Sequence, residues 1–198
     1  NSWEPAEFPT LGAGDGGYLL FMGRVIGRKG PHVAAAAARA LGMRLVVAGQ
    51  GVSSVQPGRI RALDGTSIEG DVEYAGILGP EERAQVMGAA VATFVPTQYL
   101  EPFGGVAVES QMVGTPALVT PWGGLAENVR HGESGFLCST LAEFVEAATA
   151  AGSLDRSAIR AHALATWSTE VIRHAYDAHL RRLDTLWADG WYQLKEAA

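Results

Sequence analysis

The stretch that decides the fold is YLLFMGRVIGRKGPHVAAAAARALGMRLVVAG, residues 18–49. It begins and ends with short apolar runs, 18–26 and 44–49, which have the character of buried strands. Between the two runs, Pro31 suits the first position of a helix and Gly42 suits the position just after its end. A strand, a helix and a second strand in this order predict a βαβ unit of a parallel sheet.

Short apolar strands alternate with helices along the rest of the chain as well. Further strands are expected at residues 71–78, 91–96, 116–120 and 134–138. Helices are expected at residues 80–90, 104–114, 123–132, 140–152, 154–165 and 168–188. Residues 50–70 are rich in Gly and Ser, and we expect a loop there with a short helix near Ile60. The chain is therefore predicted to be an α/β protein, a Rossmann-like parallel sheet of about six strands with helices on both faces.

Length and composition narrow the class of function. The chain has 198 residues, 47% of them hydrophobic, and a formal net charge of −6. An acidic globular chain is unlike a general nucleic-acid binder. A single cysteine, Cys138, cannot form a disulfide within the chain and is expected to be buried. The histidines lack metal-site spacing, and neither a signal peptide nor a membrane span is evident. We therefore expect a cytoplasmic protein that uses no metal.

Glycine-bearing stretches lie at the carboxyl ends of four predicted strands. They are GRVIGRKG (23–30), AGQG (48–51), TQYLEPFGG (97–105) and TPWGG (120–124). Ligands bind beyond the carboxyl ends of the strands in such sheets, so these loops are expected to meet at one site. Arg24, Arg28 and Lys29 supply cations there. The pair Gly104 and Gly105 opens a helix whose free amides would suit a phosphate. The alternative interpretation is that the three cations are ordinary surface charge.

Two glutamates flank the Gly-Gly pair among apolar neighbours. A carboxylate near a core is unfavourable unless hydrogen bonds satisfy it. Glu101 lies in the loop, and Glu109 falls in the second turn of the following helix. A carboxylate can accept two hydroxyl donors, as an acid does from ribose in dinucleotide-binding folds. A polyhydroxylated ligand that carries phosphate would satisfy both. The alternatives are structural acids that accept backbone amides and a glycosidase pair, which would have to flank a scissile bond.

These motifs resemble those of the GT-B fold, family 4 retaining glycosyltransferases. EPFGGVAVE, residues 101–109, is similar to the family's E-x7-E motif, and GRVIGRKG to its loop with Gly-Arg and Lys-Gly. AGQGV resembles the family's glycine turn, and DVEYAGIL resembles the strand that follows it. MVGTPALVT and GGLAENVRHGESGFL resemble the family's motifs nearer the C-terminus. The resemblance runs in order from residue 18 to 183. It implies the C-terminal domain of such an enzyme, the half that binds the nucleotide-sugar donor.

The resemblance also implies site residues. Arg24 and Lys29 hold the diphosphate and Glu101 contacts the donor sugar; these three are the expected catalytic residues. Glu109 binds the ribose. The other implied contacts are Gly23, Gly51, Ile77, Leu78, Phe103, Gly104, Gly105 and Val106. Gly105 stands where the family more usually has Leu, which is expected to leave room beside the helix start. The implied reaction is metal-free sugar transfer with retention from a UDP- or GDP-sugar, and no cofactor is expected.

Three segments follow from the same resemblance. Residues 1–17 would be an interdomain linker, 18–183 the nucleotide-sugar-binding domain, and 184–198 a helical tail that packs on an N-terminal acceptor domain. That domain is expected to be missing, so the chain alone would bind a donor without transferring its sugar. The missing domain is then the expected partner, and any peripheral membrane association would run through it. Two alternatives are a sugar-nucleotide epimerase-like domain and a non-catalytic nucleotide-sugar-binding or partner module.

Overall fold

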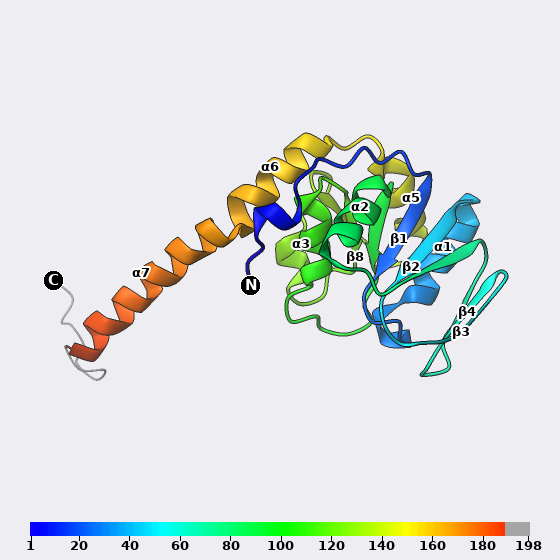
Figure 1. The fold of residues 1–198 in the computed structure, drawn as a ribbon, viewed down its shortest axis with the longest axis horizontal. Coiled ribbons are helices and arrows are strands. Elements are labelled where there is room, and N and C mark those ends of the chain that lie inside the picture. Colours follow the sequence, from blue (N-terminus) through cyan, green and yellow to red (C-terminus); the bar gives the residue numbers. More distant parts are fainter. Residues whose placement is uncertain (189–198) are drawn as a thin grey trace.

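Six parallel strands form the central sheet, in the order β6-β2-β1-β7-β8-β9 (Figure 1). The computed structural model describes residues 1–188, and side chains as far as residue 183. The strands are β1 (Tyr18–Met22), β2 (Arg44–Ala48), β6 (Val72–Gly76), β7 (Ala92–Val95), β8 (Ala117–Val119) and β9 (Gly135–Leu137). The chain builds outward from β1 through β2 to β6, and then returns to β7 on the other side. The predicted fold class is confirmed, and the order of strands reverses between β1 and β7.

Helices cover both faces of this sheet because its central strands are apolar on both sides. In β1, Leu19 and Phe21 face one core, whereas Leu20 and Met22 face the other. The first core includes residues of α1 and α5, and the second includes residues of α2, α3 and α6. The helices are α1 (Pro31–Leu41), α2 (Pro80–Ala89), α3 (Gly105–Met112), α4 (Leu125–Asn128), α5 (Leu141–Ala151), α6 (Arg156–Trp167) and α7 (Thr169–Ala188), with 3-10 turns η1 (Pro5–Glu7) and η2 (Gly27–Lys29).

The prediction for residues 50–70 is wrong. Instead of a loop with a short helix, they form an antiparallel sheet of three strands, β3 (Val52–Gln56), β4 (Arg59–Ala62) and β5 (Ser67–Glu69), at the right of Figure 1. Ile60 and Ile68 pair across β4 and β5, and both are fully buried. Exposed and buried residues alternate along β4, which is the period of a strand rather than of a helix. Gly58 and Gly65 occupy the turns between these short strands, and Gly51 and Gly70 lie just outside them.

Residues 1–17, the predicted linker, pack along the domain. Phe8 is fully buried in the second core. The guanidinium group of Arg160 donates to the carbonyl oxygens of Thr10 and Phe8, and that of Arg156 donates to the carbonyl of Gly12. These contacts join the beginning of the described chain to α6.

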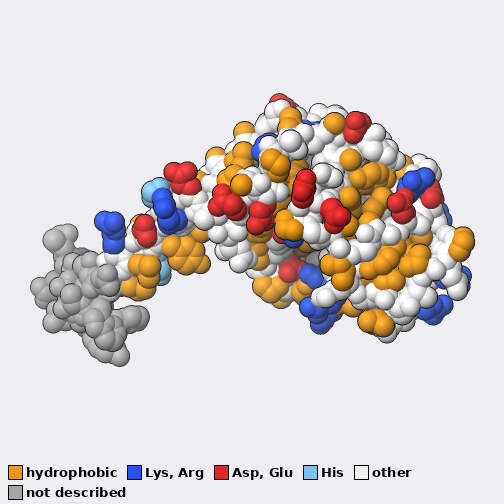
Figure 2. Space-filling model, viewed as in Figure 1, with side chains coloured by type: hydrophobic (Ala, Val, Ile, Leu, Met, Phe, Trp, Pro, Cys, Tyr) orange, Lys and Arg blue, Asp and Glu red, His pale blue; other side chains and the backbone are white. Residues whose placement is uncertain are grey.

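Helix α7 projects from the domain at the left of Figure 1. Val171, Tyr176 and Leu180 are exposed along it, and apolar side chains interrupt its charged ones in Figure 2. The tail predicted for residues 184–198 is helical as far as Ala188; residues 189–198 lie outside the described residues. Among the helices described, none has both the length and the apolar character required to cross a membrane. Cys138 is 1% exposed, as predicted.

Candidate active site

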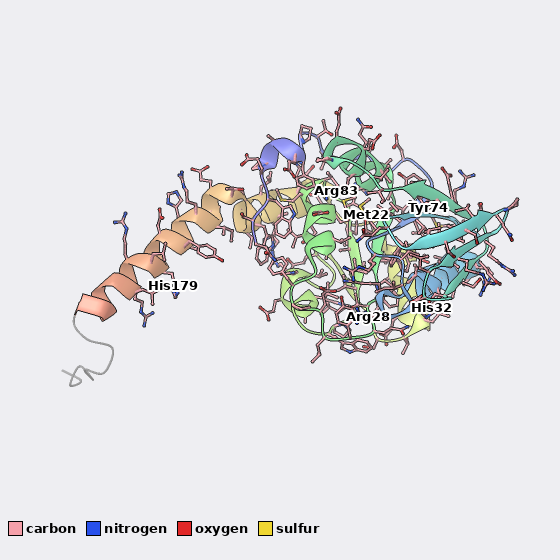
Figure 3. The ribbon with its side chains drawn as sticks, turned by 60° about the horizontal axis from the view of Figure 1, so that its bottom comes forward. Met22, Arg28, His32, Tyr74, Arg83 and His179 are labelled. Atoms are coloured by element: carbon pink, nitrogen blue, oxygen red, sulfur yellow. The ribbon has the colours of Figure 1, made fainter. Side chains whose placement is uncertain are left out.

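A cleft of about 460 Å³ opens at the carboxyl ends of β1 and β7, where the strand order reverses. This is the place at which open α/β sheets bind ligands. The predicted residues that line it are Gly23, Arg24, Lys29, Glu101, Gly104, Gly105 and Val106. Figure 3 shows Arg28, another lining residue, near the lower edge of the domain, with Met22 above it. The structure therefore brings the cations, the loop glutamate and the Gly-Gly pair together around one cleft.

The loop after β1 brings three cations to the cleft. Arg24, Arg28 and Lys29 all line it. In the part of the chain that the structure describes, no carboxylate pairs with Arg24 or Arg28 within 4.0 Å. The loop is held from outside the cleft, because Asp64, in the turn between β4 and β5, accepts a hydrogen bond from the backbone N–H of Gly27 at 2.7 Å. This contact joins the unpredicted small sheet to the predicted cation loop.

Glu101 and Lys29 form an ion pair inside the cleft. Lys29 Nζ lies 2.5 Å from Glu101 Oε2, and the Tyr99 hydroxyl donates to the same oxygen at 2.5 Å. Burial by itself would raise the pKa of Glu101, but these two donors hold it below its ordinary value. Burial would lower the pKa of Lys29, but its hydrogen bond to Glu101 holds it above the ordinary value. Both groups are therefore charged near neutral pH, and the carboxylate that looked unpartnered in sequence has a cation in space.

The amino end of α3 also lines the cleft. Gly104 precedes the helix with φ +84°, a left-handed conformation that favours glycine. A β-carbon at Gly104 would also collide with the side chain of Leu125. Gly104, Gly105 and Val106 line the cleft, so the first turn of α3 faces the same space as the cations. An anion in the cleft would meet both the positive side chains and the positive end of a helix dipole.

Glu109 lies one turn further along α3 and is not a lining residue of the cleft. Its Oε1 accepts a hydrogen bond from Trp3 Nε1 at 3.2 Å, and its Oε2 lies 3.6 Å from Arg83 Nε. Burial raises the pKa of Glu109, an effect that Arg83 and the Trp3 hydrogen bond oppose. Figure 3 shows Arg83 on α2, on the side of Met22 away from Arg28. The ribose role of Glu109 stays a prediction.

Four other predicted contacts lie outside the lining of the cleft. A β-carbon at Gly51 would lie 2.8 Å from the Val25 carbonyl oxygen, so the backbone there runs close to the cation loop. Ile77, beyond β6, is 74% exposed, and Leu78 packs against the second core. Phe103 stacks on Trp3, with ring centroids 5.6 Å apart. Their contacts with a donor stay predictions. Within the described residues, no three side chains of the His, Cys, Asp and Glu types gather as a metal site.

The space beside Gly105 is not open as expected. The indole ring of Trp3 fills it: Trp3 Cζ2 lies 3.2 Å from the position that a β-carbon of Gly105 would occupy. Nothing in the spacing of the motifs points to Trp3 or to Arg83, because the first lies in a predicted linker and the second in an ordinary charged helix. The contact of Tyr99 with Glu101 could have been predicted from the sequence, since Tyr99 stands two residues before Glu101.

Comparison with known proteins agrees with this geometry. The sequence profile described as "Glycosyl transferases group 1" matches residues 5–153. The chain belongs to this glycosyltransferase family. It is 40% identical over 135 residues to a D-inositol 3-phosphate glycosyltransferase of Acidothermus cellulolyticus, and 35% identical over 130 residues to a glycogen synthase of Mycobacterium tuberculosis. These matches cover 62% and 61% of this chain but only 30% of each relative.

Solved glycosyltransferases share the fold. A sucrose-phosphate synthase of Thermosynechococcus elongatus superposes with a TM-score of 0.72 at 21% identity, over 93% of this chain and 51% of that one. A glycosyltransferase involved in avilamycin A biosynthesis gives a TM-score of 0.72 at 28% identity, over 92% and 56%. HepE of Anabaena, solved in complex with UDP-glucose, gives 0.71 at 19% identity, over 92% and 56%. The group 1 chain described here therefore spans about half of each of these structures.

Proposed function

We propose that this chain is the donor-binding half of a retaining glycosyltransferase of family 4, which moves a sugar from a nucleoside diphosphate sugar to an acceptor. The observation that carries the proposal is the convergence of Arg24, Arg28 and Lys29 with the amino end of α3 on one cleft. An acidic chain of net charge −6 concentrates positive groups there. Such a site suits a diphosphate much better than it suits a neutral ligand.

The proposed chemistry needs these groups as the bond between sugar and phosphate breaks. The bond from the anomeric carbon to the diphosphate oxygen breaks, and the electron pair leaves with the diphosphate. Arg24 and Lys29 then stabilise the additional negative charge, because placed cations lower the barrier where charge develops. The acceptor hydroxyl forms the new bond from the face that the diphosphate leaves, and its proton passes to the departing diphosphate oxygen. Glu101 contacts the sugar, and Glu109 the ribose hydroxyls.

The identity of the base is proposed from the relatives. HepE of Anabaena was solved with UDP and with UDP-glucose, and this supports UDP as the first nucleotide to test, with GDP as the second. Transfer also needs a bound acceptor held in line with the donor. Because the chain spans 30% of the curated relatives described above, we propose that it binds the donor without transferring the sugar until an acceptor-binding domain is supplied.

Calorimetric titration of the chain with UDP, GDP, ADP and uridine tests the proposal. We expect a diphosphate to bind and uridine to bind much more weakly. Arg24→Ala should weaken diphosphate binding by roughly tenfold or more, since a hydrogen bond to a charged group contributes about 1.5–3 kcal/mol. Arg44→Ala is the matched control: Arg44 is an exposed arginine paired with Glu73, away from the cleft. Equal binding by both variants, or no binding of any diphosphate, would refute the proposal.

A further inference from the structure

The indole of Trp3 joins residues 1–17 to the wall of the cleft. Its ring lies against Gly105, which lines the cleft, and stacks on Phe103 with an angle of 27° between the rings. Its Nε1–H donates to Glu109 Oε1 at 3.2 Å. One side chain therefore touches three consecutive parts of the proposed donor site: the residue before the Gly-Gly pair, the first residue of α3 and the acid one turn later.

Trp3 is held in this place by its own backbone. Its N–H donates to the Trp167 carbonyl at 3.0 Å, and its carbonyl accepts from the N–H of Thr169 at 2.9 Å. A residue bonded on both sides to the junction of α6 and α7 has a fixed main chain. The ring has few positions open to it, because Phe103 and Gly105 limit its rotation. The contact with Glu109 is thus a built feature of the fold.

The bond to Trp3 leaves Glu109 able to accept further donors. A carboxylate has about four acceptor positions on its two oxygens. Trp3 uses one on Oε1, while Arg83 Nε, at 3.6 Å from Oε2, makes no hydrogen bond there. Enough positions remain for two hydroxyl groups of a ribose. The indole therefore fixes the direction of the carboxylate without occupying it fully.

We propose that Trp3 is a positioning residue for donor binding: its N–H orients the Glu109 carboxylate toward the ribose, and its ring closes the space beside Gly105. The proposal rests on the proposed function, since it assigns Trp3 a part in the same site. The small residue at 105 and the large residue at 3 are then a matched pair. A leucine at 105 would need the volume that the indole occupies, because a β-carbon there already lies 3.2 Å from Trp3 Cζ2.

The test compares UDP with 2′-deoxy-UDP by calorimetry on the whole 198-residue chain. Trp3→Phe keeps a ring on Phe103 but removes the N–H. Trp167→Phe is the matched control, because Trp167 packs edge-on against the same Phe103, and its Nε1 is buried without a hydrogen-bond partner. We expect Trp3→Phe to weaken UDP binding by roughly three- to tenfold, the range of one hydrogen bond, and to reduce the preference for UDP over 2′-deoxy-UDP. Trp167→Phe should change neither.

A size exchange separates packing from orientation. Gly105→Leu alone should weaken UDP binding and lower the melting temperature, because the leucine and the indole need the same space. Adding Trp3→Ala should restore the melting temperature but not the preference for UDP over 2′-deoxy-UDP. An unchanged ribose preference in Trp3→Phe, with UDP still bound and the melting temperature unchanged, would overturn the role of Trp3 and leave the proposed function standing. Failure of the unaltered chain to bind any nucleoside diphosphate would overturn the proposed function, and the role of Trp3 with it.

Discussion

Removing Lys29 should destabilise the chain through Glu101 as well as weaken the proposed phosphate site. The perturbation is a double-mutant cycle with Lys29→Met, Glu101→Gln and the pair together. An exposed ion pair contributes about 0.2–1 kcal/mol, and breaking a fully buried one is unfavourable by about 3–5 kcal/mol. The side chains here are 27% and 12% exposed. We place the coupling between these limits, at about 2 kcal/mol, by interpolating between exposed and buried pairs.

This coupling has a defined pH range. Glu101 has a lowered pKa, so its contribution to stability is present above its ordinary value of 4.5 and is lost as the pH falls through the lower folded-state value. Lys29 has a raised pKa, so its contribution is present below 10.5 and is lost as the pH rises through the higher folded-state value. The full coupling is therefore expected from about pH 5 to pH 10, the interval between the two ordinary values.

Thermal unfolding at pH 7 and at low pH measures the cycle. In a chain of this length 1 kcal/mol shifts the melting temperature by about 2–4 °C, so Lys29→Met should lower it by about 4–8 °C. The double variant should lose less than the sum of the single variants, because neither charge is left alone. UDP titration of Glu101→Gln should show binding that is undiminished, since Lys29 is released from its partner. A coupling below about 0.3 kcal/mol, the error of additivity, would refute the reasoning.

Three further outcomes test other parts of the site. Asp64→Ala frees the N–H of Gly27 from an exposed carboxylate that does not itself contact the cleft, and calorimetry should show UDP binding weakened by roughly two- to fivefold, less than for the loss of a direct contact. Unchanged binding would mean that the small sheet does not support the cation loop. Arg156→Lys removes a guanidinium that donates to the carbonyl oxygens of several residues. Urea unfolding should show the free energy of unfolding lowered by about 2–4 kcal/mol, and a decrease below about 1 kcal/mol would contradict the structural role of Arg156. Gly104→Ala meets both an unsuitable φ and the Leu125 side chain, and should reduce UDP affinity and the melting temperature together; a variant equal to the original chain would contradict the need for glycine there.

Much of the fold and half of the site could be predicted from the sequence, for identifiable reasons. Parallel strands buried on both faces are near-continuous apolar runs, so the order of strands and helices along the chain could be predicted. The Gly-Gly pair and the cations stand at fixed distances from strand ends, and the topology brings strand ends together. The small sheet was missed because its alternation covers only Arg59–Ala62 and Ser67–Glu69, and its turns resemble a loop.

The partners of the two glutamates were harder to predict, because they come from distant segments. Lys29 is 72 positions from Glu101, and Trp3 is 106 positions from Glu109. No local rule in the sequence specifies which distant side chain fills a given space. The empty volume inferred beside Gly105 shows the difficulty: the absence of a side chain at one position says nothing about what else occupies that position.

The guanidinium contacts of α6 bear on how the chain reaches this structure. Arg160 bonds to the carbonyl of Phe8, 152 positions earlier, and Arg156 bonds to that of Gly12, 144 positions earlier. Contacts this distant close almost the whole chain into one loop, and the entropy of such closure delays them relative to the local βαβ units. Residues 1–17 would then dock last, after the sheet has assembled. Glu109 would receive its indole partner only in that final step, so the proposed donor site would be complete only when the two ends of the domain have met.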